Sequence, residues 1–391
     1  MLIDNLHMKE SKLNILHIIP LLGCGGAEVL LGDIVKKQIE LGHHVLICCL
    51  HPFHPSFDNF PKKQFLLEQV PIKFIKTRVK ISLKGRTKIK GDDYKLLVED
   101  FKPNIIHAHL FEAELIAMSC VLTNVRYISH IHDNIVQFRK FHQKDLISKK
   151  RISTLKERAW LLKRYVKVKP IFLCISKDVL KYIKHNLPSI LAINAYLLPN
   201  SIDLDRFSTS SQKDFSCLSI VSVGNLVKKK NHILLVEIAS LLREKIGDNF
   251  KIEILGFGPL FEEINQKIRS ECLEEHVFLR GSVGNVDEYY KNATFYVHTA
   301  TYEPFGLVLI EAMASGLPVI SLDGSGNRDL IHTGENGILL TENNATLFVD
   351  TILSVFQNHH YYFQLAENGL NFSKDFGIDT YITKLHQLYT L

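Results

Sequence analysis

Short apolar segments alternate with amphipathic segments of helical length, and this alternation constrains the fold more than any other feature of the chain. The first half opens with a strand pattern at residues 14–19, a helical pattern at 27–41 and a second strand pattern at 44–50. Helices that separate strands in this way require parallel pairing with right-handed crossovers. Further strands are expected at 105–107, 126–131, 171–174, 218–223, 251–255, 277–279, 294–298 and 318–321.

The alternation occurs twice, which for a chain of 391 residues predicts two domains. The break falls at LLPNSIDLDRF, where Pro199 and Asn200 interrupt the periodicity. We therefore expect an α/β protein with two Rossmann-like, doubly wound domains, residues 1–199 and 200–374, that face each other across a cleft. Ligands bind at the carboxyl ends of the strands in such sheets, so the cleft is the expected site.

The composition is that of a folded globular chain, with 46% hydrophobic and 23% charged residues. Seven cysteines are scattered without any Cys-x-x-Cys pair, which favours a reducing compartment. No apolar run reaches the roughly 18 residues that a membrane span needs. The first residues also lack the pattern of a secretory signal. We expect a soluble, cytoplasmic protein.

The net charge of +6 is concentrated in two stretches, 73–90 and 139–169. The second has twelve Lys and Arg against two acids, and its segment 149–167 combines Trp160 and leucines with basic residues. This pattern suits a helix lying on an anionic membrane, which predicts peripheral attachment to the inner face of the cytoplasmic membrane. A helix packed on the sheet with a basic outer face explains the pattern equally well.

The segment EPFGLVLIEAMASGLP, which begins at Glu303, has the composition of a ligand-binding helix start. A helix beginning near Gly306 would direct the amides of Phe305, Gly306 and Leu307 at the cleft, where they and the helix dipole would bind an anion such as a diphosphate. Glu311 can face the same cleft, and a carboxylate there suits the vicinal diol of a ribose. The alternative is two glutamates on an ordinary amphipathic helix.

Other segments place suitable residues after predicted strands. Gly25 and Gly26 form a loop that lets backbone amides approach a phosphate or sugar. The stretch SVGNLVKKKNH puts lysines after the first strand of the second half, ILGFGPL ends a strand in a glycine turn, and ISHIHDN ends another with His130 and His132.

Together these residues resemble the retaining glycosyltransferases of family 4, which have the GT-B fold. The resemblance runs from the Gly-Gly-Ala-Glu loop at 25–28 over almost the whole chain, and its most specific element is Glu303 and Glu311 in EPFGLVLIEAMASGLPVI. PNSIDLDRF is similar to the interdomain segment of the family, and SGNRDLI and ENGIL to its loop after the catalytic helix. The resemblance also implies that the first domain, 1–199, binds the acceptor and the second, 200–374, binds the nucleotide-sugar donor. It further implies that the C-terminal helix, 375–391, crosses back to the first domain.

The resemblance implies a role for each matching residue. Glu311 would hold the ribose, Glu303 would contact the donor sugar, and Lys230 would neutralise the diphosphate. The amides of residues 305–307 would bind the distal phosphate. His132 would reach a sugar hydroxyl and the reacting centre.

Backbone groups would complete the donor site. Gly25 and Gly26 would leave room for the donor phosphates and the acceptor. Gly256, Ser282 and Val283 would line the base pocket.

One position departs from the family pattern. The motif normally reads Gly-Arg-Leu before its lysine, whereas Asn225 stands here in place of the arginine. This substitution removes one cation from the diphosphate clamp. Lys228 or Lys229 can supply a charge there but not the bidentate fork of arginine.

No cofactor and no metal are expected, because the resemblance implies that the nucleotide sugar is a substrate and needs no cation. Asp203 and Asp205 form an Asp-x-Asp sequence, but they lie in the linker, where aspartate caps turns. The pairs His43/His44, His107/His109 and His359/His360 lack a third ligand at a metal-binding spacing, so no structural zinc is expected.

The expected partners are a nucleotide-sugar donor, most often a UDP-sugar in this family, and a glycan or lipid-linked acceptor. We expect the acceptor to be a precursor of capsule, O-antigen or lipopolysaccharide. We expect no nucleic acid as a partner. Three other classes stay open: a nicotinamide-dependent oxidoreductase, a catalytically degenerate GT-B protein that binds a sugar nucleotide or acts as a scaffold, and a nucleic-acid-binding protein. The first loop lacks the third glycine of a dinucleotide fingerprint, and no aromatic platform accompanies the basic stretches.

Overall fold

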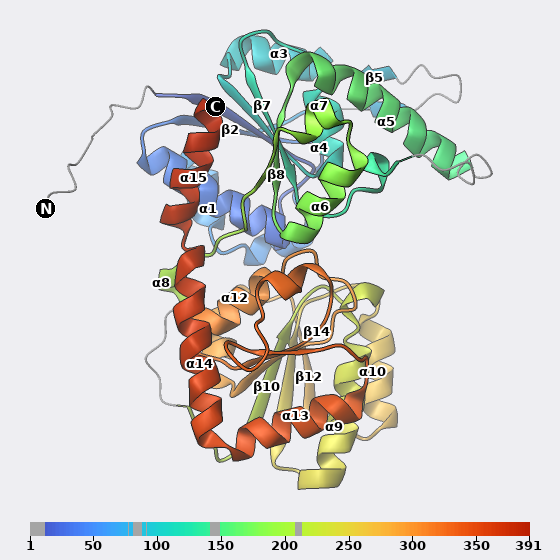
Figure 1. Cartoon of the computed structure of the whole chain (residues 1–391), viewed down its shortest axis with the longest axis vertical. Coiled ribbons are helices and arrows are strands. Elements are labelled where there is room, and N and C mark those ends of the chain that lie inside the picture. The colour runs from blue at the N-terminus through green and yellow to red at the C-terminus, as the bar shows by residue number, and fades with distance from the viewer. Residues whose placement is uncertain (1–11, 77, 81–87, 91, 141–148, 208–212) are drawn as a thin grey trace, which may run out of the picture.

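The computed structural model describes residues 12–76, 78–80, 88–90, 92–140, 149–207 and 213–391. It has two domains, one above the other in Figure 1, each built on its own sheet. Residues 77 and 81–87 of the basic stretch 73–90 lie outside the described residues, as does the 141–148 part of the second basic stretch. No helix in the described part of the chain is long and apolar enough to cross a membrane.

The first domain has a seven-stranded sheet in the order β3-β2-β1-β6-β7-β8-β9, paired in parallel throughout. Its strands are β1 (Asn14–Ile19), β2 (His44–Cys49), β3 (Ile72–Phe74), β6 (Ile105–His109), β7 (Arg126–Ile131), β8 (Ile171–Cys174) and β9 (Ala195–Leu197). Its helices are α1 (Gly26–Glu40), α2 (Lys63–Gln69), α3 (Asp92–Phe101), α4 (Leu110–Ala117), α5 (Lys149–Val168), α6 (Lys177–Asn186) and α7 (Ser189–Ala192). A separate hairpin pairs β4 (Arg78–Lys80) with β5 (Lys88–Lys90).

The second domain has a six-stranded parallel sheet in the order β12-β11-β10-β13-β14-β15. Its strands are β10 (Leu218–Val223), β11 (Phe250–Leu255), β12 (Val277–Gly281), β13 (Phe295–His298), β14 (Val319–Leu322) and β15 (Ile338–Leu340). Its helices are α8 (Leu204–Phe207), α9 (Ile233–Ile246), α10 (Phe261–Ser270), α11 (Val286–Asn292), α12 (Leu307–Ala314), α13 (Ala345–Gln357) and α14 (His359–Ser373).

The expected fold class, two doubly wound α/β sheets of the GT-B kind, is confirmed. Hydrophobic strands such as β1 and β10 are buried along almost their whole length, because helices cover both faces of a parallel sheet. The expected set of strands was incomplete, since it lacked β3, β9 and β15 and both strands of the hairpin, β4 and β5. These strands have three residues each at the sheet edges, too few for a periodic pattern.

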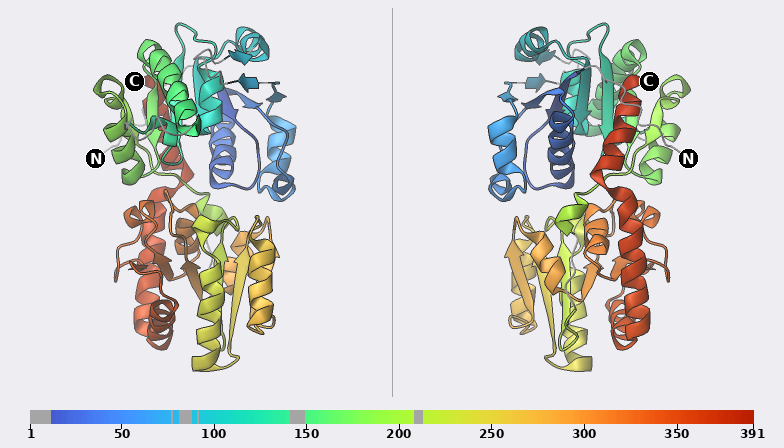
Figure 2. Two further views of the ribbon diagram at one scale, coloured as in Figure 1. Left: turned by 90° about the vertical axis from the view of Figure 1, so that its right-hand side faces the viewer. Right: turned by 90° about the vertical axis from the view of Figure 1, so that its left-hand side faces the viewer.

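The last helix, α15 (Ile378–Thr390), lies against α1 of the first domain. Figures 1 and 2 show α14 and α15 as consecutive helices along one flank, the former beside the second domain and the latter beside the first. Tyr381, Leu385 and Tyr389 of α15 are buried with Ile15 and Ile34 in one apolar cluster. The chain thus passes between the domains twice, at its linker and before α15.

Helix α5 is amphipathic and packs on the first domain. Leu161 and Tyr165 are fully buried. Arg158 donates hydrogen bonds to the carbonyls of Phe138 and Asn186, at 2.7 and 2.8 Å. The exposed side chains toward the end of this helix include Lys163, Val166 and Lys167.

Candidate active site

A cavity of about 760 Å³ lies between the two domains. The loop after β1 borders it with Gly25 and Gly26, and the second domain borders it with Leu307 at the start of α12. A Cβ atom on Gly26 would lie 3.2 Å from Cδ1 of Leu307, so the two domains approach closely at these positions. The N-termini of α1 and α12 therefore border one cavity, and both helix dipoles favour an anion there.

The start of α12 depends on Gly306. This residue caps the helix with a φ of 104°, which only glycine adopts without strain, and an added Cβ would lie 2.6 Å from Cδ1 of Leu309. Leu307, Val308 and Glu311 line the cavity. Phe305 and Gly306 are buried and do not line it.

Glu303 lies between β13 and α12 in a buried cluster with two basic residues. It pairs with Lys230, at the end of the 3-10 helix Lys228–Lys230, and its Oε2 lies 3.0 Å from Nε2 of His298. Burial alone would raise the pKa of Glu303, but the charge of Lys230 and the contact with His298 hold it at about 2. The carboxylate is therefore ionised and already paired.

The loop after β14 holds Glu303 in place through backbone contacts. The amide of Glu303 donates to the carbonyl of Gly324 at 2.7 Å, and the amide of Gly326 donates to the carbonyl of Glu303 at 2.9 Å. A Cβ on Gly326 would lie 2.0 Å from the carbonyl oxygen of Pro304. These close backbone contacts explain why Gly324 and Gly326 in the DGSGN segment are glycines.

Glu311 lines the cavity one helical turn beyond Leu307. Its Oε2 accepts a hydrogen bond from the hydroxyl of Tyr290 at 3.1 Å. Burial raises the pKa of Glu311 to about 7, although the charge of Arg206 opposes the rise. Arg206 itself donates to Asp287 and to the carbonyl of Gly284.

Glycines contribute to the second-domain wall of the cavity. Gly256 has a φ of 138°, and a Cβ there would lie 2.0 Å from the carbonyl oxygen of Gly224. Gly256, Ser282 and Val283, which the resemblance assigns to the base pocket, line the cavity. The side chain of Asn59 in the first domain donates to the carbonyl of Ser282 at 2.9 Å, which ties the two domains together on this side.

Asn225 lines the cavity and is exposed to it. Neither candidate for the missing arginine borders the cavity. Lys228 is exposed, and Nζ of Lys229 lies 3.4 Å from Oδ2 of Asp133 in the first domain.

His132 directly follows β7 and is 8% exposed. Burial lowers the pKa of His132 to about 3 despite the charge of Asp133, so the ring is neutral. The cavity lining does not include His132, Lys230 or Glu303. The residues beside them meet across the domain boundary, because the hydroxyl of Tyr302 donates to Oδ1 of Asp133 at 2.6 Å.

Three residues of the site went unnoticed in the sequence. His298 faces Glu303 from the end of β13, Arg206 borders the cavity from α8, and Glu28 borders it from the first turn of α1. Burial raises the pKa of Glu28 to about 7. Position at the end of a strand was a usable signal for His298, whereas Glu28 stands in the Gly-Gly-Ala-Glu loop, where no role was expected of it.

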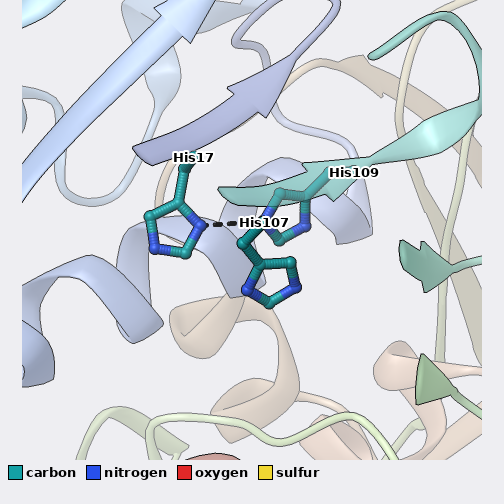
Figure 3. Close-up of side chains that lie close together, drawn as sticks. All are labelled: His17, His107 and His109. Carbon is teal, nitrogen blue, oxygen red and sulfur yellow. Dashed lines mark hydrogen bonds between the residues drawn. The ribbon is translucent and has the colours of Figure 1, made fainter. Parts of the chain in front are cut away.

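The expectation that His107 and His109 lack a third neighbour of ligand type is wrong. Figure 3 shows His17 beside them, and the ligand atoms of these three rings lie within 4.8 Å of one another. The rings of His109, His130 and His132 form a second such group. By contrast, Asp203 of the Asp-x-Asp sequence lies 3.2 Å from Nζ of Lys62, as a linker residue tied to the first domain.

Comparison with protein-family models identifies both domains as parts of a glycosyltransferase. The family model described as "Glycosyl transferases group 1" matches residues 206–372, and the model "Glycosyltransferase Family 4" matches residues 24–206. A glycosyltransferase of Methanocaldococcus jannaschii is 25% identical over 375 residues, which cover 93% of this chain and 94% of that protein. The chain belongs to the group 1, family 4 glycosyltransferases with a GT-B fold.

Other relatives match over less of their length. The poly(glycerol-phosphate) alpha-glucosyltransferase of Bacillus subtilis is 29% identical over 163 residues, 41% of this chain and only 24% of that protein. Among solved structures, Anabaena HepE in complex with UDP and glucose superposes with a TM-score of 0.76 at 18% identity, covering 97% of this chain and 99% of HepE. This likeness shows the fold.

Proposed function

We propose that this glycosyltransferase transfers a hexose from a UDP-sugar to a glycan or lipid-linked acceptor, with retention of configuration and without a metal, in the biosynthesis of a bacterial surface polysaccharide. The observation that carries the proposal is the cavity between the domains, with the start of α12, Glu311 and the Gly25–Gly26 loop on its walls. The fold neighbour HepE was solved in complex with UDP and glucose, which supports this choice of donor.

The residues take the roles that the family resemblance implies. Glu311 binds the ribose diol and the backbone near Gly256 and Ser282 binds the base, since these groups all line the same cavity. The first amides of α12 have no partner within their helix, and they bind the distal phosphate. Glu303 contacts the donor sugar.

In this mechanism the diphosphate leaves on the same face of the sugar from which the acceptor hydroxyl attacks. The leaving diphosphate accepts the hydroxyl proton, and the transition state has oxocarbenium character. Lys230 and the α12 amides stabilise the charge that develops on the diphosphate, which makes electrostatic preorganisation the main catalytic contribution. His132 accepts or donates a hydrogen bond at a sugar hydroxyl.

A thermal-shift titration with UDP, GDP, ADP and NAD tests the donor assignment. A ligand at one hundred times its dissociation constant adds about 2.7 kcal/mol of stability, which is enough for a shift of a few degrees. We expect UDP to stabilise the protein and Glu311→Ala to abolish this effect. A shift with NAD alone would contradict the assignment, and the anomeric configuration of the product by NMR tests retention.

We further propose that the protein works at the cytoplasmic face of the membrane, where a lipid-linked acceptor is presented. The basic outer side of α5, with Lys163 and Lys167 exposed beside Val166, supports this location. Flotation with liposomes that contain an anionic lipid tests it. Salt-sensitive binding that Lys163→Glu/Lys167→Glu abolishes is the expected result, and the absence of binding by the native protein contradicts it.

A second candidate function is binding of a sugar nucleotide without transfer. It is favoured by Asn225, which is neutral and faces the cavity while Lys229 pairs with Asp133. Retained UDP binding with no transfer to any acceptor, and no hydrolysis of the donor, would favour this second candidate. Gain of activity in Asn225→Arg would show which charge the native site lacks.

A further inference from the structure

Five histidines line one face of three neighbouring strands in the first domain. They are His17 on β1, His107 and His109 on β6, and His130 and His132 on and just after β7. The two-residue spacing within β6 and along β7 puts each pair on one face, and β1, β6 and β7 are adjacent in the sheet. Four of the rings are fully buried and His132 is nearly so.

Burial lowers the pKa of all five rings, to about 4 for His17 and to about 3 for His132. The rings are therefore neutral near pH 7. A neutral imidazole carries one N–H donor and one acceptor nitrogen. When one ring nitrogen donates a hydrogen bond, the other can only accept. In a series of hydrogen-bonded neutral rings, the position of the proton on one ring therefore fixes its position on the next.

The series begins at Gln38, which is buried on α1. Its Oε1 lies 2.8 Å from Nε2 of His17, and its Nε2 donates to the hydroxyl of Tyr389 at 3.1 Å. An amide oxygen can only accept, so His17 carries its proton on Nε2. Its Nδ1 is then an acceptor.

One branch runs from His17 toward the cleft. Nδ1 of His17 lies 3.0 Å from Nε2 of His109, which must donate, as the dashed line in Figure 3 marks. Nδ1 of His109 then accepts from Nε2 of His132, 3.4 Å away. His132 thus carries its proton on Nε2 and keeps Nδ1 as its acceptor nitrogen.

The other branch runs through Tyr389 and ends in the core. Having accepted from Gln38, the hydroxyl of Tyr389 donates to Nδ1 of His107 at 2.8 Å. Nε2 of His107 then donates to Nδ1 of His130 at 3.3 Å. Nε2 of His130 is buried without a hydrogen-bond partner among the described residues. Only the first branch reaches His132.

We propose that Gln38 is a positioning residue that acts through His17 and His109 to hold His132 as the tautomer protonated on Nε2. Nδ1 of His132 is then preset to accept a hydrogen bond from a hydroxyl of the donor sugar or the acceptor. The catalytic consequence rests on the proposed function of His132, whereas the tautomer itself does not.

A metal ion is the competing use of these rings, because two groups of three have ligand atoms within 4.8 Å. The hydrogen-bonded series already uses the nitrogens that face one another. Moreover, none of the five rings hydrogen-bonds to a carboxylate in the part of the chain that the structure describes. A divalent cation there would be buried without a compensating charge, which is costly.

The test compares two variants of the full-length protein at the start of the series. Gln38→Leu removes the acceptor for His17, whereas Tyr389→Phe cuts only the branch that leads to His107. Long-range ¹⁵N–¹H NMR of protein labelled at histidine reports which nitrogen of His132 is protonated, with His132→Asn for assignment. We expect Nε2 to be protonated in the native protein and in Tyr389→Phe, and a mixture of tautomers in Gln38→Leu.

Kinetics supply the second readout. We expect Gln38→Leu to lower kcat on the order of tenfold or more, because a ring in the wrong tautomer loses its oriented hydrogen bond, with the donor KM unchanged. The rate of Tyr389→Phe should stay within about twofold of the native rate, because Tyr389 lies outside the branch that reaches His132. Gln38→Glu keeps an acceptor oxygen at His17 and is expected to restore the Nε2 tautomer, which separates positioning from packing.

Three results would overturn the proposal: an unchanged His132 tautomer in Gln38→Leu, equal losses of rate in Gln38→Leu and Tyr389→Phe, or a stoichiometric metal that His17→Phe removes. The NMR measurement needs neither donor nor acceptor. Failure of the UDP titration would therefore refute the proposed function while leaving the tautomer result to stand by itself.

Discussion

Each domain has a buried histidine behind its wall of the cleft, outside the residues that line the cavity, and the two are partnered in opposite ways. His132 in the first domain hydrogen-bonds to another neutral ring, His109. His298 in the second domain lies 3.0 Å from the carboxylate of Glu303, which is itself paired with Lys230. Burial lowers the pKa of both rings, but only His298 has a bonded carboxylate that opposes the fall.

This difference shows how one cleft can serve two kinds of ligand. In the proposed mechanism, Lys230 and the N-terminus of α12 stabilise the negative charge of a nucleoside diphosphate. A cluster of neutral rings offers a hydrogen bond without a net charge, which suits a sugar hydroxyl. The asymmetry matches the proposed division of labour between a donor domain and an acceptor domain.

Removal of the cation behind the second-domain wall should have the largest effect. Lys230→Ala deletes the group that we propose stabilises the leaving diphosphate, and we expect kcat to fall on the order of 10² to 10³, as for other preorganised groups that stabilise a developing anion. Steady-state kinetics with the donor that the nucleotide titration selects will measure the loss.

The matched control is Lys228→Ala, in the same 3-10 helix. Lys228 is exposed and, unlike Lys230, does not pair with Glu303, so its removal should change kcat by no more than about twofold. Similar losses in the two variants would mean that overall basicity, and not the Lys230–Glu303 pair, distinguishes this wall.

The contact that joins the two walls should have an intermediate effect. Tyr302→Phe removes the donor to Oδ1 of Asp133, a hydrogen bond to a charged group worth about 1.5–3 kcal/mol. We expect a partly opened cleft, seen as a larger radius of gyration by X-ray scattering, and a several-fold rise in the donor KM. An unchanged radius and KM would show that contacts such as Asn59 to Ser282 suffice to hold the domains together.

The sequence predicted the elements that are buried throughout and missed those at the edges. β1 and β10 have six residues each and are almost entirely apolar or buried, so the pattern located both correctly. The edge strand β15 has only three residues, and it is defined by its pairing with β14 and not by its own composition. Edge strands of this length depend on tertiary contacts that no local pattern contains.

For the site, the sequence identified residues within one motif but not their partners from other elements. Glu303 and Glu311 follow from their common context around α12. The contact of Glu303 with His298, and that of His109 with His17, depend on the strand order β1-β6-β7 and on the turn after β13. Sequence spacing within one strand does not reveal which strand lies beside it.

The smallest expected effect is a change in the pH dependence of stability, and it concerns Glu311. Burial raises the pKa of Glu311 to about 7, whereas in the unfolded chain a glutamate titrates at about 4.3. The folded protein therefore keeps a proton that the unfolded chain releases, and the stability from this group is lost as the pH rises from about 4.3 to about 7. Glu311→Gln, which is neutral and can still accept from Tyr290, should raise the melting temperature by about 2 °C at pH 8 and leave it unchanged at pH 4. Differential scanning calorimetry at the two pH values will measure this, and equal shifts at both would mean that packing, and not ionisation, sets the effect. The same variant should bind UDP more weakly, because a neutral amide holds the ribose diol less tightly than a carboxylate does.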